Sequence, residues 1–160
     1  MLRLLASAAV ALGVAGCAGL KKPAPLKPGE GVQISQQADR LRVEVNGQLF
    51  TEYVFKDVPR PFCYPLIGPG GLAMTRNFPM KEAPAEDRDH KHHRSLWFTH
   101  GSVNGQDFWS EDKNFGRIVH DSFAEVKSGR DAGVIRSRNK WVAADGTLEA
   151  RRTGEIDGWI

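Results

Sequence analysis

The stretch that decides the fold runs from Leu41 to Phe55 and reads LRVEVNGQLFTEYVF. Apolar residues at positions 41, 43 and 45 alternate with charged or polar ones, which is the two-residue period of a half-buried strand. The pair Asn46-Gly47 favours a tight primed turn, and residues 49–55 are rich in the aromatic and β-branched types that suit a returning strand. We therefore predict a β-hairpin here.

A second hairpin is predicted further along the chain, with strands at Gly133–Val142 and Thr147–Ile156 around the turn Ala144–Gly146. Arg117–His120 and Ser122–Lys127 have the pattern of two further short strands. No long amphipathic helix is indicated after residue 17. The predicted fold class is therefore mostly β, an antiparallel β-sandwich.

The N-terminus has the pattern of a bacterial lipoprotein signal. Arg3 precedes an apolar run from Leu4 to Val14, and small residues then lead to Cys17. We predict that residues 1–17 are a signal peptide and that Cys17 is acylated, so that membrane lipid is a partner through this cysteine. The residue after it is Ala18, which for lipoproteins favours the outer membrane, facing the periplasm, in a Gram-negative host.

Residues 18–31 are rich in proline and lysine and are predicted to be a stiff, solvated linker to a single domain at residues 32–160. The 22 basic and 19 acidic residues leave a small, dispersed positive charge, so nucleic acid is not an expected partner. With Cys17 acylated, Cys63 has no disulfide partner, and its apolar neighbours predict a buried, unreactive thiol.

The segment from Asp87 to Trp109 is the richest in chemistry, because it holds four of the five histidines and two of the four tryptophans. Imidazoles titrate or bind metals near neutral pH, and indoles offer flat faces for stacking. We expect the functional site in this segment.

Several motifs follow one another between Tyr64 and His120. They are Tyr64-Pro65-Leu66, Gly68-Pro69-Gly70-Gly71, Thr75 to Pro79, Asp89 to Phe98, His100-Gly101, Val103-Asn104-Gly105, Asp107-Phe108-Trp109 and Gly116 to His120. Together these motifs resemble a bacterial family usually labelled "PmoA family" or "methane oxygenase PmoA". The resemblance implies an exported or soluble β-rich protein of unsettled biochemistry, often associated with sugar catabolism, and a fold like the galactose-mutarotase supersandwich.

The resemblance also implies a longer family domain, and the chain ends inside a β pattern at Gly154–Ile160. We therefore expect this chain to hold the N-terminal portion of a truncated family domain. Methane oxidation is not expected, because a membrane monooxygenase subunit needs several apolar helices and no apolar run after residue 17 is long enough to span a bilayer.

One hypothesis for the histidines is a divalent metal site, and a divalent metal is the candidate cofactor. If residues 89–94 are extended, His90 and His92 point to the same face and can chelate an ion. His100, Asp107 or residues outside this chain would then complete the ligand set.

A second hypothesis is a site for a carbohydrate or a related polar small molecule. Trp97 and Trp109 would stack on a sugar ring, while Arg94 and Asn104 would bind hydroxyl or carboxylate groups. This function is the one that we favour from the sequence.

If the site is catalytic, His93 and His100 are the predicted proton-transfer groups, with Asp107 as the carboxylate partner of an epimerase-like or lyase-like reaction. Glu111 is an alternative partner. A third hypothesis is a non-catalytic ligand-binding or structural module, in which Arg94 is a buried ion-pair partner of Asp89 or Asp107.

Overall fold

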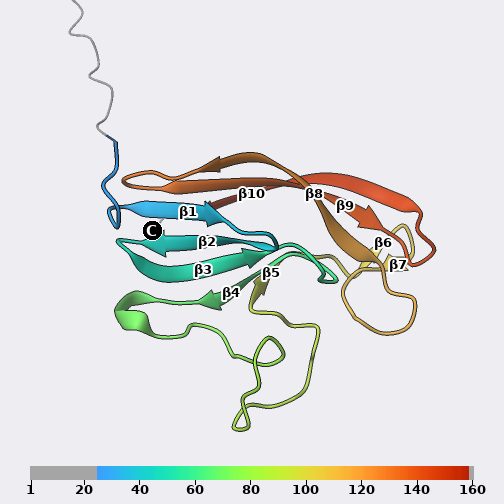
Figure 1. Ribbon diagram of the computed structural model, residues 1–160. Helices are drawn as coiled ribbons and strands as arrows, with labels where there is room; N and C mark the ends of the chain where they lie inside the picture. The colour runs from blue at the N-terminus through green and yellow to red at the C-terminus, as the bar shows by residue number, and fades with distance from the viewer. Residues whose placement is uncertain (1–24, 159–160) are drawn as a thin grey trace, which may run out of the picture.

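The computed structural model describes residues 25–158, with side chains described up to residue 148. Apart from one short 3₁₀ helix, the regular structure in this range consists of strands (Figure 1). The strands are β1 (Val32–Gln36), β2 (Arg40–Val45), β3 (Gln48–Val54), β4 (Phe62–Leu66), β5 (Leu96–Trp97), β6 (Ser102–Val103), β7 (Gln106–Asp107), β8 (Arg117–Lys127), β9 (Gly133–Val142) and β10 (Leu148–Gly158).

The first sheet has the strand order β1-β2-β3-β4-β5, and every neighbouring pair is antiparallel. Its centre is the predicted β2–β3 hairpin, in which Val45 pairs with Gln48. Asn46 and Gly47 both have positive φ angles, 49° and 77°, as a primed two-residue turn requires. The hairpin predicted from residues 41–55 is therefore confirmed.

The second sheet has the order β10-β9-β8, and the predicted β9–β10 hairpin is also confirmed. The two short strands expected before it are a single strand, β8. The register of β8 shifts between His120 and Ser122 and again between Phe123 and Glu125. Each register shift interrupts the alternation of side chains along the strand. The sequence of this one long strand therefore has the pattern of two short strands.

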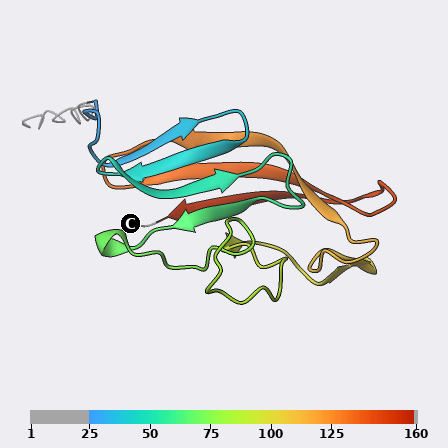
Figure 2. The ribbon, with the colours of Figure 1, turned by 60° about the horizontal axis from the view of Figure 1, so that its bottom comes forward.

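The two sheets pack face to face, as Figures 1 and 2 show from two directions. Their core joins Leu41, Val43 and Tyr53 of the first sheet to Ile135 of the second. At one edge, reciprocal backbone hydrogen bonds of 2.8 and 3.0 Å connect Val32 to Gly129, just beyond β8. The predicted mostly β, antiparallel sandwich class is confirmed.

A smaller hydrophobic cluster positions the functional segment. Phe108 is fully buried against Trp141 of β9, with ring centroids 4.9 Å apart, and Ile118 completes the cluster. Thr99 Oγ1 donates a hydrogen bond of 2.6 Å to the backbone oxygen of Phe108. The loops on either side of Phe108 are thereby held at one end of the second sheet.

The connection from β4 to β5 is long and irregular, and lies along the β4–β5 side of the molecule (Figure 1). The motif Gly68 to Gly71 contains the short 3₁₀ helix η1 (Pro69–Gly71). Glu86 braces this connection, because its carboxylate accepts hydrogen bonds from the backbone nitrogens of Asn77 and Phe78 at 2.7 and 2.8 Å. The segment is thus ordered by polar contacts rather than by a sheet.

Cys63 is buried in β4, and burial raises the pKa of its thiol to about 11. This agrees with the prediction of an unreactive cysteine. The predicted signal peptide at residues 1–17 and the acylated Cys17 lie outside the described residues. Within residues 25–158, no helix is long and apolar enough to cross a membrane.

Candidate functional site

Three histidines converge on a single tight turn. The backbone nitrogen of His93 donates a hydrogen bond of 2.8 Å to the backbone oxygen of His90, so the chain reverses between them. His90 has a φ of 40°, in the left-handed region. The donor atoms of His90, His92 and His93 all lie within 4.8 Å of one another. The extended conformation considered for residues 89–94 is therefore wrong, and the turn adds His93 to the predicted pair.

Arg76 holds the start of this turn. Its Nη1 donates to Oδ1 of Asp89 at 2.7 Å, and its Nη2 donates to the backbone oxygens of Asp89 and His90 at 2.8 and 3.0 Å. Asp89 Oδ2 in turn lies 3.6 Å from Nε2 of His90. One arginine thus supports both the backbone of the turn and the carboxylate beside its first histidine.

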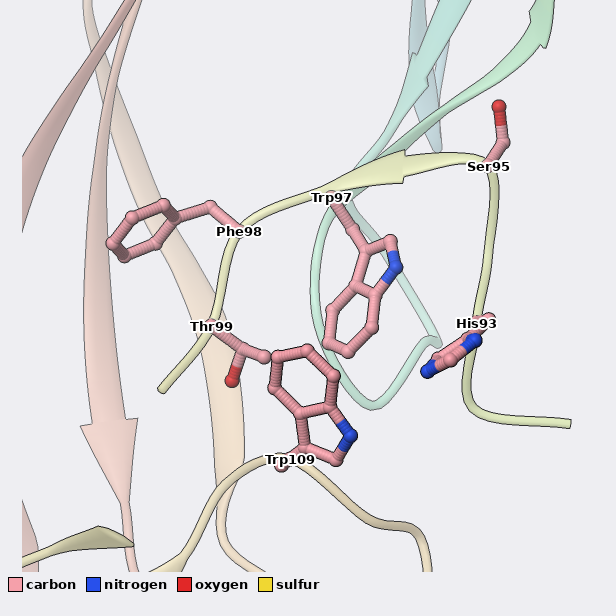
Figure 3. A pocket seen from close by; sticks show the side chains of 6 residues that line it. All are labelled: His93, Ser95, Trp97, Phe98, Thr99 and Trp109. Carbon is pink, nitrogen blue, oxygen red and sulfur yellow. The ribbon is translucent and has the colours of Figure 1, made fainter. Parts of the chain in front are cut away.

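Trp97 and Trp109 form an aromatic pair next to the histidine turn. Trp97 belongs to β5, Trp109 follows β7, and their ring centroids lie 5.0 Å apart with an interplanar angle of 51°. The His93 ring lies 5.9 Å from the Trp97 ring and 5.8 Å from the Trp109 ring. Figure 3 shows these three rings beside one another.

An open pocket of about 350 Å³ lies at this aromatic pair. Trp109 is 44% exposed, so a flat face is available to solvent and to a ligand. The volume is within the range of small-molecule sites. The pocket is lined by His93, Ser95, Trp97, Phe98, Thr99 and Trp109.

A charged cluster lies behind Trp97. The Arg60 guanidinium carbon is 5.0 Å from the Trp97 ring centroid, and its side chain is only 1% exposed. Arg60 Nη1 lies 3.6 Å from Oε1 of Glu111, and Nη2 donates to the backbone oxygen of Ser110 at 3.1 Å. Glu111 also accepts hydrogen bonds from both Nη atoms of Arg94. Two guanidinium groups therefore share one carboxylate.

Burial shapes the ionisation of this cluster. Desolvation, followed by the positive charge of Arg94, lowers the pKa of Arg60 to about 10. Arg60 therefore stays charged at neutral pH. Desolvation also lowers the pKa of Arg94. The ion-pair partner of Arg94 is Glu111, rather than the Asp89 or Asp107 considered from the sequence. The predicted contact of Arg94 with substrate stays a prediction.

The pKa values of His92 and His93 are both lowered. Burial is the largest cause of each shift. The next cause is the neighbouring imidazole, which is His93 in the case of His92 and His90 in the case of His93. A histidine with a pKa below its usual value near 6.5 is mostly neutral at pH 7. The turn therefore presents neutral imidazoles beside the aromatic pair.

Asp107, predicted as a catalytic carboxylate, orders the loop that carries Trp109. Its Oδ1 accepts hydrogen bonds from the backbone nitrogens of Trp109 at 2.7 Å and Ser110 at 3.2 Å, and its Oδ2 accepts one from the Ser110 hydroxyl. Burial acts to raise the pKa of Asp107, but these hydrogen bonds and Arg60 together lower it. Asp107 is not among the residues that line the pocket.

His100 and Asn104 also lie outside the pocket lining. His100 is exposed, and its Nδ1 is 3.1 Å from the backbone oxygen of Ser102. Asn104 has a φ of 52° and, with Gly105, forms the two-residue turn between β6 and β7. Positive φ favours asparagine and glycine, so this pair has a clear role in the turn.

Sequence reasoning missed several residues of this region, among them Phe98 in the pocket lining. Thr99 lines the pocket and lies two residues after Trp97, so the strand period could have indicated it. Ser95 lines the pocket as well, and its hydroxyl is 2.7 Å from that of Thr75. Arg60 is distant in sequence, and no local signal marks its position behind Trp97.

Comparison with known proteins assigns the chain to a family. Residues 40–156 match a family of unknown function, DUF6807. The chain belongs to this family. No curated protein and no solved structure shows a significant match to the chain.

The DUF6807 match runs from the start of β2 almost to the end of β10. It therefore includes the histidine turn, the aromatic pair and the Arg60–Glu111 cluster. The candidate site is a feature of the DUF6807 region, rather than of the segments outside it.

Proposed function

We propose that this chain is an exported, lipid-anchored DUF6807 domain that binds a carbohydrate or a related polar small molecule in the pocket beside Trp97 and Trp109. The observation that carries the proposal is the aromatic pair itself, with centroids 5.0 Å apart at the mouth of a pocket of about 350 Å³. The C–H face of a sugar ring packs well on an indole, and its hydroxyls need polar partners at the edge.

The pocket supplies such partners. His93 brings ring nitrogens to its wall, and Ser95 and Thr99 bring hydroxyls. Each of these hydroxyls already has one protein partner and can accept a further hydrogen bond from a ligand. The arrangement of flat apolar faces with a few polar groups suits a polyhydroxylated ligand better than an apolar one.

Among the predicted proton-transfer residues, His93 is the one that lines the pocket. An epimerase-like or lyase-like reaction in this pocket would use His93 as its acid or base, with a neutral imidazole ready to accept a proton. Asp107 and Arg94 would act indirectly, by ordering the Trp109 loop and holding Glu111.

The cellular context is part of the proposal. Acylated Cys17 would anchor the domain, and residues 18–31 would separate it from the membrane, on the periplasmic side of the outer membrane in a Gram-negative host. The resemblance to the proteins labelled PmoA supports an exported β-rich domain and the larger supersandwich. Metabolic labelling with a fatty acid tests the anchor: we expect label in the natural chain and none in Cys17→Ser.

Ligand binding is tested by calorimetry with a panel of neutral sugars, amino sugars and sugar acids. We expect one class to bind saturably, and Trp97→Ala and Trp109→Ala each to weaken its affinity at least about tenfold, as loss of a stacking contact implies. Leu72→Ala is the matched control, because Leu72 is 69% exposed and lies outside the pocket lining. Equal affinity in all three variants would sink the proposal.

A further inference from the structure

We propose that His90, His92 and His93 form a three-histidine site for a borderline transition-metal ion such as Zn²⁺. The inference goes beyond ligand binding in the aromatic pocket and does not depend on it. The first observation is that three histidines of one four-residue turn have donor atoms within 4.8 Å of one another. Lys91, between the first two histidines, is exposed.

The distances are close to those of a bound ion. Zn–N bonds of about 2.0–2.1 Å in a tetrahedral site put neighbouring nitrogens about 3.4 Å apart. From a spread of at most 4.8 Å, rotation of the histidine rings about their side-chain torsions brings the nitrogens to that spacing. The rings of His90 and His93 are stacked, with centroids 4.8 Å apart and an interplanar angle of 10°. Because imidazole lone pairs lie in the ring plane, one of these two rings has to turn for both to bind the same ion.

The ring nitrogens of His92 and His93 are available as ligands. Within the part of the chain whose side chains are described, no hydrogen bond to these nitrogens is found, and the contacts of the two rings are with each other, with His90 and with the two tryptophans. Neutral imidazole nitrogens that have no hydrogen-bond partner among the described side chains can act as metal ligands.

The surroundings of His90 match the support that metal ligands need. Asp89 lies 3.6 Å from Nε2 of His90 and is itself held by Arg76. A carboxylate near one ring nitrogen orients the imidazole and leaves the other nitrogen, Nδ1, for a metal. The Arg76 hydrogen bonds to the backbone oxygens of Asp89 and His90 fix the turn from the same side.

The donor set selects the kind of ion. Three imidazole nitrogen donors suit Zn²⁺, Cu²⁺, Ni²⁺ or Co²⁺, whereas Mg²⁺ and Ca²⁺ prefer oxygen ligands. Three protein ligands also leave one tetrahedral position open. The rings of His92 and His93 lie 5.8–6.5 Å from those of Trp97 and Trp109, so this position borders the aromatic pocket.

The test is equilibrium dialysis of the untagged full chain against Zn²⁺, with no sugar present. We expect one Zn²⁺ per chain, no competition from excess Mg²⁺ or Ca²⁺, and at least about tenfold weaker binding in His92→Ala and His93→Ala. His100→Ala is the matched control, because His100 is exposed and lies outside the turn. Circular dichroism verifies that each variant is folded.

A second measurement reports the ligand set directly. Co²⁺ added to the metal-free chain should give the visible absorption bands of a tetrahedral site, and His93→Gln should remove them. Saturable binding that is unchanged in the histidine variants, or no binding to the folded natural chain, would overturn the proposal. Because no pocket ligand is used, these outcomes are independent of whether the aromatic pocket binds a sugar.

Discussion

Glu111 accepts hydrogen bonds from both terminal nitrogens of Arg94, and the two side chains are only 10% and 19% exposed. The same carboxylate lies 3.6 Å from the fully buried Arg60. One carboxylate thus contacts two guanidinium groups behind the aromatic pocket, and the stability of this region should depend strongly on it.

Replacing Glu111 with alanine is expected to lower the free energy of unfolding by about 3 kcal/mol or more, because two buried cations lose their shared partner. Urea denaturation measures the change. Glu82→Ala is the control: Glu82 pairs with Arg88 on the surface and is 74% exposed, so we expect a change within about 0.5 kcal/mol. Similar losses in the two variants would show that Glu111 has no special role.

Stability should fall in mildly acidic solution because of His120. Its ring packs against both Phe55 and Phe123, with centroids 4.6 and 4.3 Å away. Burial lowers the pKa of His120 and outweighs the opposite effects of Asn139 and Asp121. His120 therefore binds a proton more readily in the unfolded chain than in the folded one. Its contribution to the free energy of unfolding is complete above about pH 6.5 and is lost as the pH falls below that value.

We expect His120→Gln to have a smaller decrease in melting temperature than the natural chain between about pH 7 and pH 5. His100→Ala, at an exposed position, should follow the natural chain. Identical pH profiles for His120→Gln and the natural chain would contradict the assignment.

Gly116 is required by the close approach of Phe108. A Cβ atom at position 116 would lie 2.4 Å from Cε1 of the buried Phe108 ring. We expect Gly116→Ala to cost about 1–3 kcal/mol of stability, as overpacking of a core does. Gly101→Ala is the control, since a Cβ there meets nothing within 4 Å. A neutral effect of Gly116→Ala in thermal unfolding would mean that this contact relaxes freely.

The turn at Asn46-Gly47 offers a test of backbone conformation. Gly47 has a φ of 77°, and a Cβ at this position meets no atom closer than 3.5 Å. Any loss of stability in Gly47→Ala therefore comes from the backbone conformation. We expect the free energy of unfolding to fall by about 1 kcal/mol. Chemical denaturation measures it, with Gly101→Ala again as the control. A loss well above this would point to a packing defect instead.

The candidate site contains contacts that a local sequence pattern does not predict. Trp97, Trp109 and His93, which lie in the histidine- and tryptophan-rich segment 87–109, line one pocket in the structure. The pairing of Arg94 with Glu111 was not identified, because the two residues are 17 positions apart and Asp89 and Asp107 were equally good carboxylates on sequence grounds.

The sequence by itself determined the class of fold and the two hairpins, because alternation of apolar residues and turn pairs such as Asn46-Gly47 act over a few neighbouring residues. Only the tertiary structure decided how the site is assembled. The hydrogen bond between His93 and His90 closes the histidine turn, and burial brings Arg60 behind Trp97 from a distant part of the chain. These contacts depend on packing between segments, which a local sequence pattern does not encode.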